Sequence, residues 1–271
     1  MNMSEKRCLD VGGTFIKCDD GRQVPTCSKG TAEEMSAAFR EAVGPVDSLR
    51  QLGIAIPGPF EFRKGIFLMK HKFDAAYGLS FRELAGIPPH VDVKYLHDVN
   101  AVLVGAVDML GLRECNCSLV TLGTGLGYTY AVKGEVQCNE MGSPARGLWN
   151  RPWEDGMLED RISARGIRNA YEDITGDSSQ SAYDIAQRAF AGEEAALRVF
   201  RQTGEILAPF LKEEAEELGL SVILFGGQIS KSLALMLEPM TGLLGDVQLL
   251  PAPEGAVFRG LDTLFEDVKD R

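Results

Sequence analysis

Short apolar runs alternate with amphipathic stretches along the chain, and most of the runs end at glycine or proline. RCLDVGGTFIKCDDG at 7–21 predicts a β-hairpin around a Gly-Gly-Thr turn. LGIAIPGPF at 52–60, HVDVKYL at 90–96 and SVILFGGQIS at 221–230 predict strands, the first and last of them buried. Strands that alternate with helices favour mostly parallel or mixed sheets flanked by helices, an α/β fold.

The helical stretches carry recognisable start and stop signals. Thr31, followed three residues later by Glu34, predicts a capping box at the start of a helix that runs to Val43. Gly111 is expected to end a helix that begins near residue 98. Further helices are predicted at 81–86, 158–174, 182–218 and 256–268.

The opening pattern occurs a second time in the middle of the chain. At 115–136, CNCSLVTLGTGLGYTYAVKGEV again reads as a strand, a glycine-rich turn and a second strand. No linker or low-complexity segment separates the two halves. The repetition predicts two closely packed domains of similar build.

Composition narrows the function. With 45% hydrophobic and 25% charged residues, the 271-residue chain has the make-up of a globular protein. The formal net charge of −11 argues against a general nucleic-acid binder, because phosphate neutralisation needs a basic surface. No segment approaches the about 20 apolar residues of a membrane span, and the start has no apolar signal stretch. We therefore expect a cytoplasmic protein with no membrane partner.

The cysteines are scattered and are expected to be free thiols. Cys115 and Cys117 form a C-x-C pair that would suit a metal, although no second Cys/His pair lies nearby in the sequence. The alternative is a pair of small, buried or half-buried residues at the entrance to a strand. Cys8 and Cys18 occupy hydrophobic positions of the predicted hairpin.

Three strand-to-glycine junctions suit phosphate and nucleotide binding. At 10–14 and 123–127, glycines would let backbone N–H groups approach phosphate oxygens. Asp10 could order Mg²⁺ through water, and Phe225-Gly226-Gly227-Gln228 could admit a flat adenine. Each junction alone could equally be a tight turn, and neither glycine turn has the spacing of a P-loop or a dinucleotide fingerprint. Three of them in this order are a much stronger signal.

Together these elements resemble the ROK family of sugar kinases and sugar-responsive regulators, within the actin, hexokinase and Hsp70 superfamily. The resemblance implies two actin-like (ribonuclease H-like) domains with an active-site cleft between them. It places an N-terminal domain at 1–114, completed by the C-terminal helix at 256–271, and a second domain at 115–255. The motifs that carry it are LDVGGTFIK at 9–17, IAIPGPF at 54–60, HDVNAVLVGA at 97–106, VTLGTGLGYTYAVKGEV at 120–136, NEMGS at 139–143, GMLEDRIS at 156–163 and LFGGQIS at 224–230.

The resemblance also implies site residues. Asp98 would be the general base that accepts a substrate hydroxyl proton, whereas as an isolated residue it could be a helix N-cap. Gly58, His97, Glu140 and Glu159 would contact the substrate, the two glutamates because carboxylates accept sugar hydroxyls well. The residues implied in ATP binding are Asp10, Gly12, Gly13, Thr14, Lys17, Thr124, Gly125, Gly127, Gly226 and Gly227.

The chain departs from the family pattern at several positions. Ser143 stands where the family's Glu-x-Gly-His has histidine, and the cysteine-rich zinc loop is replaced by SPARGLWNRPWEDG at 143–156. We therefore expect no zinc site, with Trp149 and Trp153 packing the loop instead. His97 replaces the usual asparagine, and His71 or Lys72 occupies the region of another. These changes would tune the pocket to a different sugar or mark a pocket that has lost activity.

The preferred hypothesis is an ATP-dependent, Mg²⁺-requiring kinase that phosphorylates a hydroxyl of a hexose or hexose derivative. The alternatives are a noncatalytic sugar-binding protein and a sugar-responsive regulator. The regulator is disfavoured, because the first phosphate strand begins near Arg7 and leaves no room for a DNA-binding helix-turn-helix. The sequence leaves open which sugar is the substrate and which of its hydroxyls is phosphorylated. It also leaves open whether ATP or polyphosphate is the donor, and whether the protein forms a homodimer.

Overall fold

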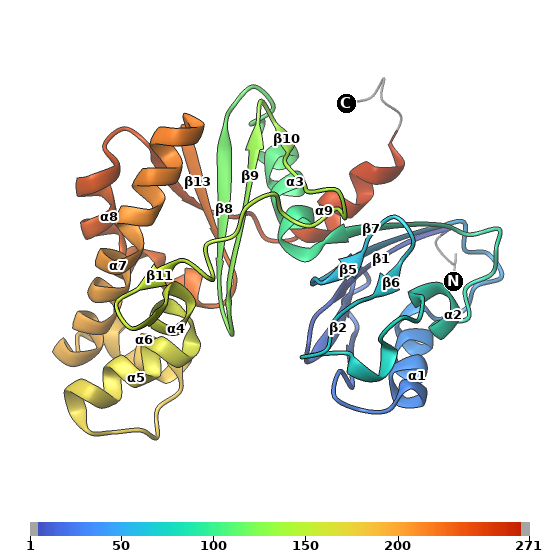
Figure 1. Cartoon of the computed structure of the whole chain (residues 1–271), viewed down its shortest axis with the longest axis horizontal. Coiled ribbons are helices and arrows are strands. Elements are labelled where there is room, and N and C mark those ends of the chain that lie inside the picture. Colours follow the sequence, from blue (N-terminus) through green and yellow to red (C-terminus); the bar gives the residue numbers. More distant parts are fainter. Residues whose placement is uncertain (1–4, 267–271) are drawn as a thin grey trace. The chain divides into compact units, whose positions relative to one another are not determined.

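Each half of the chain builds a five-stranded sheet, and both sheets have the same strand order and directions (Figure 1). The computed structural model describes residues 5–266. In each sheet the central strand pairs antiparallel with a two-stranded meander on one side. On its other side it pairs parallel with one strand, which pairs parallel with the edge strand. The first sheet runs β3 (Gln23–Pro25), β2 (Phe15–Cys18), β1 (Lys6–Val11), β4 (Gln51–Ile56), β7 (Asp92–His97). The second runs β10 (Glu135–Val136), β9 (Leu126–Val132), β8 (Cys117–Leu122), β13 (Val222–Gly226), β14 (Gln248–Pro251).

Two short hairpins complete the strands. They are β5 (Phe60–Glu61) with β6 (Ile66–Phe67), and β11 (Pro152–Trp153) with β12 (Gly156–Met157). The predicted repetition of a strand–glycine turn–strand unit is thus present as β1–β2 and β8–β9, each at the centre of its sheet. Strand β14 was not predicted.

The chain divides by its contacts into two units. Unit 1 comprises Met1–Gly111, Cys138–Ala145 and Glu254–Arg271, and unit 2 comprises Leu112–Gln137 and Arg146–Pro253. Residues 138–145, which the sequence places within the second domain, pack with unit 1. Among residues 5–266, no helix is both long and apolar enough to cross a membrane.

The helices of unit 1 begin and end close to the predicted signals. Thr31 and Glu34 form the expected capping box of α1 (Ala32–Val43), and Gly111 ends α3 (Asp98–Leu110) in the left-handed conformation, with φ of 67°. Helix α9 (Ala256–Asp262) is shorter than predicted and continues as a 3₁₀ turn to Phe265; the predicted end near 268 lies outside the described residues. The remaining helical segments are η1 (Asp74–Ala76) and α2 (Phe81–Leu84).

In unit 2, two helices that were predicted as continuous are each broken. Ser163 is extended and separates α4 (Leu158–Ile162) from α5 (Ala164–Thr175). Gly192, with φ of 90°, follows α6 (Ala182–Phe190) before α7 (Glu194–Leu218) begins. The unpredicted segments η2 (Ile229–Leu235) and α8 (Leu237–Leu244) follow β13.

Strand β1 contributes side chains to two cores, because successive residues of a strand point to opposite faces. Leu9 and Val11 pack into the core that holds Phe39 of α1, while Cys8 faces the opposite side with Ala101 of α3 and Leu261 of α9. Helices α3 and α9 approach closely through glycines. A side chain at Gly105 or Gly260 would collide with the backbone of the facing helix. The β1–β4–β7 part of the sheet is therefore covered on both faces.

Candidate functional site

Four of the predicted site residues of unit 1, Asp10, Gly58, His97 and Asp98, lie at the carboxyl ends of three neighbouring parallel strands. Asp10 is near the end of β1, opposite Ala55 of β4, and His97 is the last residue of β7, opposite Ile56. Gly58 lies two residues after the end of β4, and Asp98 follows directly after β7. In open α/β sheets ligands bind beyond the carboxyl ends of the strands, so this edge is the candidate site.

Asp10 is a half-buried carboxylate beside a lysine. Its Oδ2 lies 3.4 Å from Nζ of Lys17, and its side chain is 19% exposed. Burial raises the pKa of Asp10, the Lys17 ammonium lowers it and the nearby Asp98 carboxylate raises it, and the net result is a pKa above its ordinary value. Two acidic groups that repel each other at a sheet edge suit a divalent cation, since its charge would relieve the repulsion.

The first glycine turn is half-exposed at Gly12 and Gly13, and a second lysine, Lys72, lies beside it. A side chain at Gly12 would meet the Phe15 carbonyl, which already accepts the Gly12 N–H. At Gly13 the nearest group to an added Cβ is the Lys72 side chain, whose Nζ would be 3.6 Å away. Thr14 is exposed. Sequence reasoning treated Lys72 only as a departure from the family pattern, whereas the structure places its ammonium at the turn predicted to bind phosphate.

His97 contacts Asp98 and is also hydrogen-bonded to Gly58, which follows the neighbouring strand β4. Nδ1 of His97 lies 2.8 Å from Oδ1 of Asp98, at an angle that departs from an ideal hydrogen bond, and Nε2 accepts the Gly58 N–H at 3.2 Å. The Phe62 ring packs 5.7 Å from the imidazole, between ring centroids. His97 is thereby fixed on both sides.

Asp98 is the first residue of α3, and its carboxylate remains accessible with 37% of the side chain exposed. Oδ1 also accepts the Val99 N–H at 2.8 Å, while Oδ2 accepts no hydrogen bond from the described residues of unit 1. Burial raises the pKa of Asp98, but contact with His97, the Val99 N–H and the Lys72 ammonium together hold it below its usual value. The N-cap of α3 is His97, so Asp98 is not the helix cap that its position alone would suggest.

The segment 138–145 forms a tight turn fastened to α3. Asn139 binds the backbone N–H groups of Met141 and Ser143 through its Oδ1, and buried Asn100 donates to the Gly142 carbonyl at 3.3 Å. Glu140 is exposed at the tip of the turn, and its carboxylate has no hydrogen-bond or ion-pair partner among residues 5–266. Ser143 Oγ lies close to Gly58, 3.4 Å from where a Cβ would be.

In unit 2, the second glycine turn is held by the helices that follow it in sequence. Oε2 of Glu159 accepts the Leu126 N–H at 2.8 Å, and the Ala164 N–H donates to the Gly123 carbonyl at 2.8 Å. A side chain at Gly125 would meet Glu159 Oε2, while nothing lies within 4 Å of a Cβ at Gly123. Thr124 is exposed at the tip, and Gly127 lies in β9.

The Gly226–Gly227 junction lies beside this turn in the sheet. Gly226 pairs with Thr121 at the end of β8. Gly227 has a φ of 84°, and a side chain there would collide with the Leu122 backbone. Glycine is therefore required at 227 both by conformation and by space.

The loop at 143–156, which stands where the family pattern has a zinc loop, is held by two of its own arginines, which pair with glutamates on helix α7. Glu214, with a side-chain exposure of 3%, accepts the Tyr128 hydroxyl at 2.9 Å and faces Arg146 and Arg151 at 3.5 and 3.8 Å. The same arginines also pair with Glu217 and Glu213, and Arg151 lies over the Phe210 ring. We call Arg146, Arg151, Glu213, Glu214 and Glu217 the loop ion network.

The tryptophans and cysteines divide between buried and exposed positions. Trp153 packs edge-on against Phe210 as expected, but Trp149 is 54% exposed and does not pack the loop. Cys117 is buried at the start of β8, and burial raises its pKa to about 12. Cys8 and Cys18 are buried as predicted. Within residues 5–266, no three His, Cys, Asp or Glu side chains are grouped to hold a metal.

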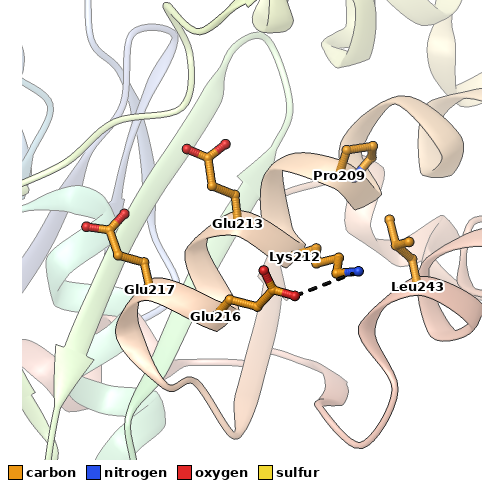
Figure 2. A pocket seen from close by; sticks show the side chains of 6 residues that line it. All are labelled: Pro209, Lys212, Glu213, Glu216, Glu217 and Leu243. Atoms are coloured by element: carbon orange, nitrogen blue, oxygen red, sulfur yellow. Dashed lines mark ion pairs between the residues drawn. The ribbon is translucent and has the colours of Figure 1, made fainter.

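Two surface hollows of unit 2 have no predicted site residue in their lining. One, of about 670 Å³, is lined by Pro209, Lys212, Glu213, Glu216, Glu217 and Leu243. Figure 2 shows its three glutamates and Lys212 along α7, with Lys212 paired to Glu216. The other, of about 710 Å³, lies among α4, α5 and α7 and includes Trp153 and Arg161. Neither combines the carboxylates and glycine turns that the predicted chemistry needs.

Comparison with solved structures identifies the fold. No protein-family profile matches this sequence, and no curated protein does. A ROK-family glucokinase from Streptomyces griseus, solved with glucose and AMPPNP, superposes with a TM-score of 0.78 at 20% identity over 96% of this chain and 98% of that one. A ROK hexokinase from Thermus thermophilus superposes with a TM-score of 0.71 at 20% sequence identity, over 93% of this chain and 95% of that one. A ROK transcriptional regulator, homologous to the E. coli MLC protein, superposes with a TM-score of 0.73 at 16% sequence identity, over 96% of this chain and 78% of that one.

These similarities extend over nearly the whole chain although few residues are identical. They confirm the α/β class and the two repeated sheets that the sequence predicts. The chain therefore has the fold of the ROK sugar kinases, as the resemblance of its motifs led us to expect.

Proposed function

We propose that the chain is an ATP-dependent kinase that phosphorylates a hydroxyl group of a hexose or hexose derivative. The observation that carries the proposal is the arrangement of Asp98. Its Oδ1 contacts Val99 and His97, while Oδ2 has no partner among the described residues of unit 1, at the carboxyl ends of β1, β4 and β7. A carboxylate held by one oxygen and open at the other is suited to accept a proton.

In this mechanism Asp98 Oδ2 takes the proton of the substrate hydroxyl as that oxygen attacks the γ-phosphorus, and ADP leaves. The glycine turn at 12–14, with Lys17 and Lys72 beside it, would bind phosphate oxygens. The turn of unit 2 at Thr124, Gly125 and Gly127 would do the same through its backbone, and Gly226 and Gly227 would border the adenosine. Gly58, His97, Glu140 and Glu159 remain the proposed sugar contacts.

Mg²⁺ fits the residues present, since Asp10 is a half-buried carboxylate repelled by Asp98. Asp10 would hold the ion through water, and the ion would neutralise charge on the transferring phosphoryl group. We further propose a cytoplasmic protein that binds no nucleic acid, with a homodimer as one possible assembly.

A noncatalytic sugar-binding protein is the second candidate. It is favoured by the fact that two departures from the family pattern, His97 and Ser143, both adjoin Gly58. An ADP-release assay with ATP and Mg²⁺, screened over hexoses, amino sugars and acidic sugars, decides between them. The kinase proposal expects acceptor-dependent ADP release from at least one sugar. Sugar binding by calorimetry without ADP release from any acceptor would favour the second candidate.

A further inference from the structure

We propose that His97 is a positioning residue for Asp98: its Nδ1 lies in close polar contact with Oδ1 of the carboxylate, while its Nε2 accepts a hydrogen bond from the Gly58 N–H. The proposal rests on the proposed kinase function and deepens it. It gives a role to the histidine that stands where the family pattern has asparagine.

Two independent contacts require the same tautomer of His97. The Gly58 N–H donates to Nε2 at 3.2 Å, so Nε2 must present a lone pair. Nδ1 lies 2.8 Å from a carboxylate oxygen, a distance at which two unprotonated atoms would repel, so Nδ1 must carry the proton. The ring is therefore the neutral Nδ1–H form, set by the bond that the other nitrogen makes.

The surroundings hold the ring in this orientation. His97 is the last residue of β7 and pairs with Ile56 of β4, which fixes its backbone beside Gly58. Its side chain is only 16% exposed and packs against the Phe62 ring. A side chain at Gly58 would lie 3.3 Å from Nε2, so glycine leaves the space that the imidazole uses.

The consequence concerns which oxygen of Asp98 can react. The Val99 N–H donates a hydrogen bond to Oδ1, and Nδ1 of His97 lies 2.8 Å from the same oxygen. The carboxylate therefore cannot rotate without losing both contacts. Oδ2 is thereby fixed as the atom that accepts the hydroxyl proton. Positioning of this kind acts on the chemical step rather than on substrate affinity.

Substituting His97 by asparagine or by glutamine keeps one of its two contacts and removes the other. The amide nitrogen of Asn occupies about the place of Nδ1 and can still donate to Asp98, but Asn does not reach Gly58. The amide of Gln occupies about the place of Nε2 and can accept from Gly58, but it leaves Asp98 without the donor. His97→Asn and His97→Gln therefore form a matched pair, and His90→Gln, at an exposed position before β7, controls for loss of an imidazole.

The first arm of the test needs no substrate. In the full-length protein with ¹⁵N-labelled histidine, long-range ¹H–¹⁵N spectra at neutral pH report the tautomer of each imidazole, and His97→Asn assigns the His97 signals. The proposal expects a single Nδ1–H tautomer for His97. An Nε2–H tautomer or a mixture of the two would overturn it.

The second arm measures steady-state kinetics with the acceptor found in the ADP-release screen. His97→Gln should lower kcat by about tenfold or more with KM changed little, since the close polar contact between Nδ1 and the Asp98 carboxylate is lost. His97→Asn should stay within about threefold of the unmutated kcat, and His90→Gln should match it. Equal activity of the Asn and Gln variants would overturn the positioning role. If the unmutated protein releases no ADP with any acceptor, the proposed function fails, and the tautomer arm still decides whether His97 holds Asp98.

Discussion

The backbone N–H of Leu126 donates a hydrogen bond to Oε2 of Glu159 at 2.8 Å, which ties the second glycine turn to the start of α4. The resemblance to sugar kinases assigned Glu159 to the substrate. In the structure one of its oxygens is already used to shape a turn that is proposed to bind phosphate. The other oxygen has no partner among the described residues of unit 2, so a sugar contact and a loop contact are compatible on one side chain.

Because of this bond, Gly123 is a better position than Gly125 for a substitution that tests phosphate binding at the turn. Gly125→Val would press on Glu159 as well as on a phosphate, whereas a side chain at Gly123 meets nothing within 4 Å. We predict that Gly123→Val keeps the melting temperature but weakens ATP binding by at least about tenfold, about 1.4 kcal/mol, because it adds bulk where phosphate must approach. Calorimetric ATP titration measures this, with Gly242→Val in α8, equally open, as control. Equal ATP affinity in the two variants would remove the turn from the site.

Lys72 provides a second prediction. Its ammonium adjoins Gly13 and lowers the pKa of Asp98, so it is placed to stabilise negative charge on a phosphoryl group. Lys72→Met should lower kcat/KM for ATP by about 10- to 100-fold in the ADP-release assay. Lys70→Met, in the same segment but with its ammonium over the Tyr77 ring, is the matched control. If the two variants behave alike, Lys72 has no part in phosphate binding.

Asp10 is expected to destabilise the protein at neutral pH. Its pKa is raised in the folded state, so the folded form holds its proton more tightly than the unfolded form does, and stability is lost as pH rises through the shifted pKa. We predict that Asp10→Asn raises the melting temperature at pH 7 while abolishing kinase activity. The gain should vanish below about pH 3.8, where Asp10 is protonated in both states. A lower melting temperature at pH 7 would show that the Lys17 pair outweighs the cost of burial.

The loop ion network takes the structural place of the missing zinc loop. Removing both arginines leaves the Glu214 charge buried and unpaired, which typically costs about 3–5 kcal/mol. Arg146→Met/Arg151→Met should therefore destabilise by more than the sum of the single variants, measured by urea unfolding. Glu216→Gln, on the same helix but exposed and paired only with Lys212, should change stability by less than about 1 kcal/mol.

The same account predicts that the loop is independent of metal. Elemental analysis should find no stoichiometric zinc, and chelators should leave the melting temperature unchanged. One tightly held zinc per chain, or unfolding by a chelator, would contradict the assignment of residues 143–156 to an arginine-held loop.

The fold could be predicted from the sequence mainly where local signals were strong. Glycine turns after apolar strands located β1–β2 and β8–β9, and the Thr31–Glu34 capping box fixed α1. The breaks at Ser163 and Gly192 were missed, since both lie inside stretches whose helical periodicity continues across them. Strand β14 was missed because QLLP is only four residues long and depends on pairing with β13.

From the sequence, residues of the candidate site could be proposed where a single motif carries the chemistry. Contacts between segments that are distant in the sequence could not be predicted. Asp98 could be proposed from its motif alone. The approach of Lys72 to Gly13, the bond from Gly58 to His97 and the reach of Asn100 to Gly142 all join residues far apart in the sequence. Nothing in the periodicity of either segment specifies such a contact, because it is created by the packing of the sheet.

The most direct test of the account is the rate of acceptor-dependent ADP release by Asp98→Asn relative to the unmutated protein. Asparagine keeps the size and an oxygen for Val99 and His97, but it cannot accept the hydroxyl proton. General-base catalysis contributes about 10²–10⁴-fold, so we predict a fall of at least that order in kcat with sugar affinity by calorimetry changed little. An Asp98→Asn variant with the kcat of the unmutated protein would contradict the assignment of Asp98 as the catalytic base.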